Sequence, residues 1–280
     1  MDYINVQNTQ LPLVGLGTFS LKTDLMGNVF ATAIENGCCL IDTAQRYGNE
    51  KDIQLALGTI GVPRDKVILE TKVSGDLLLG NLRYLRLNKK SIKSTYRESC
   101  QNLGTSFLDI YLIHAPYNGF EKHYCNLIKL QEETDIKLIG ICNVTIDHLK
   151  QLKTKTGAFP QLVQIEMHPY YTNKDLLLFC KDNGIAVESR SPFVHGDAFD
   201  EWNKEPILLS LSNKYNKTIP QIILRWVTQQ DVIALPRSNN AEHIQENCNI
   251  FDFVLEESEI EQIDKMNKNK SFGCKPSKIL

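Results

Sequence analysis

The pattern on which the fold depends is complete in one stretch, residues 162–188, which reads LVQIEMHPYYTNKDLLLFCKDNGIAVE. It opens with a short apolar run, residues 162–166, of the kind that forms a buried strand. Residues 172–183 follow with a helical pattern, and Gly184 is a typical stop at the end of a helix. A second apolar run, residues 185–188, begins directly after this glycine. The stretch therefore predicts a strand, a helix and a second strand.

The same unit recurs along the chain, because short apolar runs alternate with longer segments of helical pattern. Eight runs occupy residues 13–17, 40–42, 67–71, 108–113, 137–141, 162–166, 185–188 and 232–235. Eight such units within about 250 residues are typical of a (β/α)8 barrel, or TIM barrel. A doubly wound open sheet shares the alternation, but residues 15–20 (GLGTFS) lack the third glycine of its dinucleotide-binding fingerprint.

Three further segments accompany the predicted barrel. Residues 2–12 precede the first barrel strand and are expected to form a small β-hairpin. Two helical segments, residues 219–229 and 256–266, are extra to the eight units. No linker or change of composition interrupts the chain, so we expect an α/β fold with a single domain over residues 1–280.

Composition narrows the class of protein. The 280 residues include 31 Lys and Arg against 33 Asp and Glu, with a net charge of −2. This balance excludes a strongly basic nucleic-acid binder and gives no reason to expect a membrane surface as a partner. Neither a secretory signal nor a membrane-spanning apolar run is recognisable. The eight cysteines form no CxxC motif and no zinc-ligand spacing, so we expect reduced thiols, no metal and a cytoplasmic protein.

Polar residues at the ends of the predicted strands indicate an active site, because TIM-barrel chemistry lies at the C-terminal ends of the strands. Asp42, Lys72 and His114 follow or end the second, third and fourth strands, and Tyr47 lies just beyond Asp42. Paired with Asp42, a buried Lys72 stays charged and can lower the pKa of a neighbouring tyrosine, which then serves as a general acid. Each residue alone could be a helix cap, loop packing or an exposed loop end. Together they favour catalysis.

Two blocks of sequence, residues 41–50 (IDTAQRYGNE) and 108–116 (LDIYLIHAP), carry three of these four residues. Shorter matching segments stand in the same order along the chain, at residues 15–18, 71–72, 140–143, 164–170, 235–238 and 246–247. From about residue 4 to residue 267, the chain resembles the aldo-keto reductase family. The resemblance implies NAD(P)H-dependent reduction of a carbonyl to an alcohol. By this match Tyr47 donates the proton, Lys72, held by Asp42, lowers the pKa of Tyr47, and His114 orients the carbonyl.

The resemblance also implies a set of cofactor contacts. Asn143 and Gln164 would bond the nicotinamide carboxamide, and Arg237 would bind the adenosine 2′-phosphate. His243 stands where a second arginine is common and is mostly neutral near neutral pH, so we expect NADPH with NADH still allowed. The complete implied set is Thr18, Asp42, Cys142, Asn143, Gln164, Arg190, Ser191, Arg237, Ser238, His243, Glu246 and Asn247.

Two residues depart from the family pattern beside the nicotinamide. Arg190 stands where an aromatic ring is usual, and its guanidinium can stack on a ring but would repel oxidised nicotinamide. We therefore expect Arg190 to favour the reduced cofactor. Cys142 stands where serine is usual, and a thiol is a weaker hydrogen-bond partner. It is interpreted as a small buried residue, with an oxidisable thiol as the alternative.

The substrate side implied by the resemblance comprises Phe19, Val73, His114 and Ala115. Ala115 replaces a large tryptophan of many relatives, which predicts an open pocket. Residues 75–88 are rich in leucine and arginine, and we interpret them as a solvated basic helix face, with a lid for anionic substrates as the alternative. The tail after residue 266 is short, which favours small aldehydes, ketones or keto sugars.

Two functions from different classes remain open. The first is an NADPH-dependent carbonyl reductase, and the second is a catalytically weak regulatory protein that senses the cofactor on the same barrel. The complete set of Asp42, Tyr47, Lys72 and His114 favours the enzyme. We expect a small carbonyl substrate as the partner, no nucleic acid, no membrane, and a monomer, with a dimer as the alternative.

Overall fold

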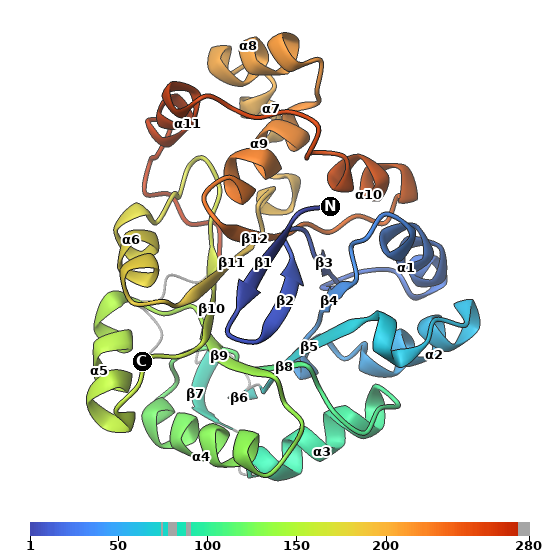
Figure 1. The fold of residues 1–280 in the computed structure, drawn as a ribbon, viewed down its shortest axis with the longest axis vertical. Helices are drawn as coiled ribbons and strands as arrows, with labels where there is room; N and C mark the ends of the chain where they lie inside the picture. Colours follow the sequence, from blue (N-terminus) through green and yellow to red (C-terminus); the bar gives the residue numbers. More distant parts are fainter. Residues whose placement is uncertain (74, 78–82, 88–90, 274–280) are drawn as a thin grey trace.

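The barrel predicted from the alternating pattern is present in the structure, a computed structural model. The structure describes residues 1–73, 75–77, 83–87 and 91–273, and gives the backbone alone at 75–77 and 83–87. Eight parallel strands form a nearly closed barrel inside a ring of helices (Figure 1). They are β3 (Leu16–Gly17), β4 (Leu40–Asp42), β5 (Ile68–Val73), β8 (Ile110–Ile113), β9 (Leu138–Cys142), β10 (Leu162–Glu166), β11 (Ala186–Arg190) and β12 (Val232–Leu235).

The first and last strands of the barrel meet through backbone hydrogen bonds. The N–H of Gly15 donates to the carbonyl of Ala234 at 2.9 Å, and the N–H of Ala234 donates to the carbonyl of Leu13 at 2.9 Å. A Cβ on Gly15 would lie 2.7 Å from the Leu235 side chain, so the close approach of the two segments depends on this glycine. The ring brings the C-terminal ends of all these strands to one face.

The helices of the ring follow the barrel strands in order. They are α1 (Met26–Glu35), α2 (Glu50–Ile60), α3 (Ile92–Asn102), α4 (Phe120–Glu132), α5 (Ile146–Thr156), α6 (Lys174–Asp182), α9 (Ile219–Thr228) and α10 (Ala241–Cys248). Thr145 caps the start of α5, because its side chain accepts from the N–H of His148. The predicted stop after α6 is confirmed, since Gly184 has a φ of 65°, which glycine adopts readily.

One of the two extra helices was assigned wrongly from the sequence. Residues 219–229 were expected to be extra, but α9 packs against β12 and α10 as the ring helix of the seventh unit. The extra helix is α8 (Pro206–Tyr215), which follows the short α7 (Phe199–Trp202) and lies outside α9 (Figure 1). Because α8 covers the outer side of α9, nearly every residue of α9 is buried.

The other predicted extra helix and the N-terminal hairpin are confirmed. Helix α11 (Glu257–Asp264) contacts α8. Strands β1 (Tyr3–Val6) and β2 (Thr9–Pro12) pair antiparallel and lie across one end of the barrel (Figure 1). Hairpin side chains join strand side chains in an apolar cluster of Val6, Leu11, Leu13, Leu40, Ile110, Leu112, Leu138, Cys142, Leu162, Ile233 and Leu235. This packing leaves the opposite end of the barrel for polar residues.

The segment after β5 is a hairpin and not the predicted helix face. Its backbone forms β6 (Gly75–Leu77) and β7 (Arg83–Leu87), which pair antiparallel. Extended backbone separates neighbouring side chains onto opposite sides, so a helical face cannot form there. The side chains of residues 74–90 and the tail from residue 274 lie outside the described residues, so the lid alternative stays a prediction.

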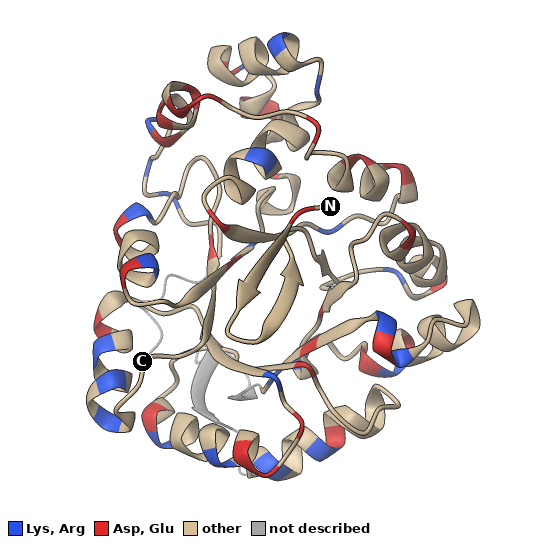
Figure 2. Cartoon of the chain, viewed as in Figure 1, with Lys and Arg blue, Asp and Glu red and all other residues tan. Residues whose placement is uncertain are grey.

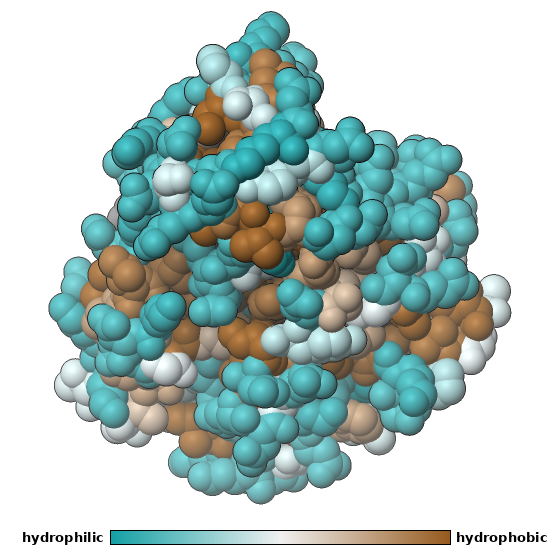
Figure 3. Space-filling view, turned by 45° about the horizontal axis from the view of Figure 1, so that its top comes forward, coloured by the Kyte–Doolittle hydropathy of each residue, from teal (hydrophilic) through white to brown (hydrophobic). Residues whose placement is uncertain are grey.

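The outer surface agrees with the near-balanced charge. Figure 2 shows Lys and Arg side by side with Asp and Glu on the outer helices. On the face drawn in Figure 3, hydrophobic areas alternate with hydrophilic ones. None of the helices in the described part of the chain has the length and apolar character that a membrane crossing requires. The seven cysteines that the structure describes are free thiols.

Candidate active site

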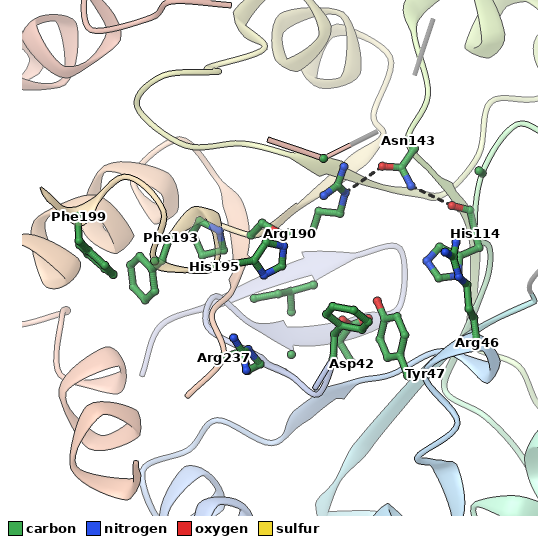
Figure 4. Close-up of a pocket in the computed structure, with 18 of the residues that line it drawn as sticks. Asp42, Arg46, Tyr47, His114, Asn143, Arg190, Phe193, His195, Phe199 and Arg237 are labelled. Carbon is green, nitrogen blue, oxygen red and sulfur yellow. Dashed lines mark hydrogen bonds between the residues drawn. The ribbon is translucent and has the colours of Figure 1, made fainter. Parts of the chain in front are cut away.

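A cavity of about 520 Å³ opens at the C-terminal ends of the barrel strands. Tyr47 and His114 line one part of it, and Arg237 lies on the other side of the cavity (Figure 4). Nine residues of the predicted site line this cavity, namely Phe19, Asp42, Tyr47, His114, Ala115, Asn143, Arg190, Ser191 and Arg237. Strand ends that are far apart in the sequence thus meet at one hollow.

Lys72 and Asp42 form a buried ion pair beside the cavity. The Lys72 side chain is fully buried on β5, and its Nζ contacts Asp42 Oδ1 and donates to the carbonyl of Thr43 at 2.9 Å. Burial lowers the pKa of Lys72, but the interaction with Asp42, followed by those with Tyr47 and Glu70, raises it well above its usual value. Lys72 is therefore a cation at every pH at which the protein would work.

Tyr47 lies on a short 3-10 turn, η2 (Gln45–Tyr47), between three of the other predicted residues. Its ring centroid is 5.4 Å from Lys72 Nζ, 5.0 Å from the ring of Phe19 and 5.8 Å from the ring of His114. Burial raises the pKa of Tyr47 to about 12, although Lys72 lowers it. Lys72 thus acts in the expected direction, but desolvation outweighs it and the net pKa of Tyr47 is raised. The hydroxyl holds its proton at neutral pH.

His114 follows β8 and lines the cavity beside Arg46 (Figure 4). The backbone N–H of His114 donates to the carbonyl of Val73 at 3.1 Å, which ties the end of β8 to the end of β5. Burial lowers the pKa of His114 well below its usual value, and the charges of Lys72, Arg46 and Arg190 lower it further. The imidazole is therefore neutral at pH 7 and can donate one N–H without carrying a charge.

Asn143 connects His114 to Arg190 across the cavity. Its Nδ2 donates to the carbonyl of His114 at 2.9 Å, and its Oδ1 accepts from Arg190 Nε at 2.9 Å (Figure 4). The backbone of Asn143 has a φ of 57°, a conformation that asparagine tolerates better than most residues. The same residue thus turns the chain after β9, holds the backbone of His114 and orients the side chain of Arg190.

Glu166 gathers Arg190 and the segment 271–273 on one carboxylate. Its Oε2 lies 3.2 Å from Arg190 and accepts from Ser271 Oγ at 2.8 Å, and its Oε1 accepts from the N–H of Phe272 at 2.7 Å. Burial alone would raise its pKa, but bonds to His168, Arg190, Phe272 and Ser271 lower the pKa of Glu166 to about 2. Glu166 is therefore an anion that anchors Arg190 and this late segment.

The loop after β11 is conformationally strained where it lines the cavity. Positive φ values occur at Ser191 (53°), Val194 (45°), His195 (57°) and Gly196 (98°). A β-branched residue such as Val194 adopts this region only under constraint from its surroundings. Strain of this kind concentrates at functional sites, and this loop borders the space between Arg190 and Arg237.

The predicted nucleotide-binding residues after β12 are only partly brought together. Arg237 lines the cavity, and its guanidinium donates to the carbonyl of Ser20 at 3.4 Å. Ser238 Oγ lies 3.5 Å from His243 Nδ1, so these two side chains share the corner where α10 begins. Glu246 and Asn247 lie near the end of α10, outside the residues that line the cavity, and Asn247 is buried.

Four predicted contact residues lie beneath or beside the cavity and do not line it. Thr18 is buried, and its hydroxyl donates to the carbonyl of Asp42 at 3.0 Å. Val73 packs in the apolar core, and Gln164 bonds to carboxyl groups inside the barrel. Burial raises the pKa of Cys142 well above its usual value, and a buried protonated thiol is chemically inert. This environment favours the small-residue interpretation of Cys142.

Sequence reasoning missed several residues that border the site. Arg46, Tyr117, His195 and Gly273 line the cavity, and Glu166 holds Arg190. The sequence could have indicated two of them. Arg46 lies inside the 41–50 block, and Glu166 is the last residue of a predicted strand. Gly273 had no such signal, since its place depends on how the chain folds back after α11.

Comparisons with known proteins agree with this geometry. The model of the "Aldo/keto reductase family" matches residues 14–268. The glyoxal reductase of Bacillus subtilis is 31% identical over 283 residues, which span 100% of this chain and 98% of that protein. The crystal structure of MGS-M4, an aldo-keto reductase from a deep-sea metagenome library, superposes with a TM-score of 0.87 at 29% identity, over 99% of both chains. The crystal structure of an aldo-keto reductase of Bombyx mori in complex with NADP superposes with a TM-score of 0.83 at 27% identity. The match covers 98% of this chain and 95% of that chain.

Proposed function

This chain belongs to the aldo/keto reductase family, and from that premise we propose that it reduces small aldehydes, ketones or keto sugars to alcohols with NADPH. The observation that carries the proposal is one cavity in which a protonated Tyr47 lies between the Lys72–Asp42 ion pair and a neutral His114. Each of these groups has the protonation state that carbonyl reduction requires.

The bound cofactor supplies a hydride to the carbonyl carbon. His114 donates its N–H to the carbonyl oxygen and fixes the orientation of the substrate. Tyr47 Oη then donates its proton to the developing alkoxide. Lys72, which Asp42 holds in place, stabilises the tyrosinate that remains, and this stabilisation makes the transfer easier although Tyr47 is a weak acid in the free protein.

The chemistry of the cavity fits a dinucleotide phosphate. Arg237 offers a planar guanidinium for a phosphate group, and Ser238 and His243 lie at the same corner. Toward Tyr47, the groups that would hold the nicotinamide are Asn143, Arg190 and Ser191. We assign Thr18, Cys142 and Gln164 to the support of the cavity floor, because all three are buried and none lines the cavity.

The walls on the substrate side favour a small carbonyl compound. Phe19 is half exposed and contacts Tyr47 with the two rings tilted, and the small Ala115 leaves room beside His114. Tyr117 and Arg46 complete this side. The similarity to a glyoxal reductase supports a small aldehyde as the substrate class.

The decisive experiment is a panel of glyoxal, short aldehydes, ketones and keto sugars, assayed by the oxidation of NADPH and, in parallel, of NADH. We expect turnover of several small carbonyls with NADPH as the better cofactor, and a loss of turnover of about 100-fold or more in Tyr47→Phe. Tight binding of NADPH without any turnover by the wild-type protein would contradict the proposal and support the cofactor-sensing alternative.

A further inference from the structure

The interior of the barrel below Lys72 holds more acidic groups than the reaction uses. Asp42, Glu70 and Glu188 come from β4, β5 and β11, and all three are almost completely buried. Strand register sets their common level, because Asp42 pairs with Glu70 across β4 and β5, and Gln164 pairs with Glu188 across β10 and β11. Among the described residues at this level, Lys72 supplies the one ammonium group, which pairs with Asp42 and Glu70 and acts on Glu188 through its charge alone.

Gln164 joins the three carboxyl groups across the barrel. Its Nε2 lies 3.1 Å from Asp42 Oδ1, 2.8 Å from Glu70 Oε1 and 2.9 Å from Glu188 Oε2. An amide nitrogen carries two hydrogens, so it cannot satisfy three carboxylates at once. Within the described part of the chain, Glu70 Oε2 and Glu188 Oε1 have no hydrogen-bond partner. At least one of the three contacts therefore lacks a donor, and a protonated carboxyl group supplies the donor that the layer needs.

The positive charge of Lys72 is already compensated by Asp42. Its Nζ contacts Asp42 directly and lies 3.7 Å from Glu70 Oε1. Ionisation of both Glu70 and Glu188 would place two further negative charges in a dry interior, where like charges cannot both persist. Burial, followed by the charge of Glu188, raises the pKa of Glu70 well above its usual value, and burial raises the pKa of Glu188 to about 7.

We propose that Glu70 and Glu188 share one proton and act as positioning residues that set the negative charge beneath Lys72 and Tyr47. The groups that face this pair are Asp42 on β4, Lys72 on β5, Gln164 on β10 and the Cys142 thiol on β9. When the shared proton leaves to solvent, the layer gains one negative charge. That charge holds the proton of Tyr47 more firmly, and proton donation to the substrate slows.

The first test needs no activity and so does not depend on the proposed reduction. Infrared spectroscopy detects the carbonyl stretch of a protonated carboxylic acid at a pH where exposed carboxyls are ionised. We expect this band in the wild-type protein at pH 6.5, with a loss of intensity in a single titration as the pH rises. The band should disappear in Glu70→Gln/Glu188→Gln and persist in Glu50→Gln, which changes a buried acid on α2 outside the layer. Absence of the band from the wild-type protein would overturn the proposal, whether or not the variants fold.

The second test rests on the proposed function. The rate of carbonyl reduction should fall about threefold to tenfold as the pair loses its proton, because one added charge shifts a neighbouring acid by roughly one pKa unit. This fall should be lost in Glu188→Gln and kept in Glu50→Gln. If the band is present but the fall is the same in Glu188→Gln, the pair exists without a role in positioning. If no carbonyl is reduced at all, only the proposed function fails.

Discussion

Arg190 and Glu166 form an ion pair of 3.2 Å at the ends of β11 and β10, where their strands are in register. The guanidinium also donates from Nε to Asn143 Oδ1 at 2.9 Å, so two neighbours orient it over the cavity. Because Glu166 is an anion that balances Arg190, the positive charge facing the proposed nicotinamide position is partly compensated. The effect of Arg190 on the cofactor therefore depends on Glu166.

We predict that Arg190 disfavours the oxidised cofactor. Arg190→Tyr should bring the dissociation constants of NADPH and NADP+ closer together, because it removes a cation beside a positively charged ring. Glu166→Gln should move them apart, because it removes the balancing anion. Fluorescence titration of both cofactors in the three proteins checks the prediction. A ratio that is the same in wild type and Arg190→Tyr would contradict it.

Glu166 should contribute to stability in a pH-dependent way. Its pKa in the folded protein is about 2, below the usual value of 4.5, so the ionised form is favoured by folding. Its contribution is present above about pH 4.5 and is lost as the pH falls toward 2. Glu166→Gln should therefore cost about 3 kcal/mol at pH 7 and progressively less below pH 4.5. Urea unfolding at several pH values measures this difference.

Glu201→Gln is the matched control for that experiment. The neighbouring Tyr170 and Lys268 also lower the pKa of Glu201, but this carboxylate is exposed and solvent screens its interactions. Its substitution should leave the unfolding free energy nearly unchanged over the same pH range. Equal effects of the two substitutions would show that the buried geometry of Glu166 is unimportant.

Tyr47 should keep its proton far into the alkaline range. The proton donor works in its protonated form, so deprotonation of Tyr47 should limit the reduction only as the pH approaches 12. Ultraviolet titration of tyrosinate should show one high-pH group fewer in Tyr47→Phe than in the wild-type protein. The same variant should lose about 100-fold to 10,000-fold in turnover while NADPH still binds. A tyrosinate signal from Tyr47 near pH 8 would refute the protonation state assigned to it.

Gly140 should be irreplaceable in the barrel. A Cβ at this position would lie 2.1 Å from the carbonyl oxygen of Leu162 and 2.9 Å from Leu112 Cδ2. The clash is with the backbone of a paired strand, so relief would separate β9 from β10. We expect Gly140→Ala to cost at least about 2 kcal/mol of unfolding free energy in urea. Gly58→Ala in α2 has open space and should be neutral or stabilising by up to about 1 kcal/mol.

The sequence predicted those parts of the protein that depend on local pattern. Each barrel strand overlaps a predicted apolar run, since strand and helix periodicities are visible within a few residues. Asp42, Tyr47 and His114 could be named for the same reason, because a TIM barrel places strand ends at the active site. The assignment of residues 219–229 failed where periodicity cannot tell a ring helix from an extra one.

The contacts between distant parts of the chain were decided by the tertiary structure alone. Glu166 meets Phe272 across 106 positions, and Gln164 meets Asp42 across 122. Ring closure creates these neighbours, and no local pattern encodes them. The raised pKa of Tyr47 belongs to the same class, because desolvation depends on everything that surrounds a group and not on its sequence neighbours. The sequence by itself thus determined the barrel and the polar strand ends of the candidate active site, whereas the folded interior determined the protonation of those residues.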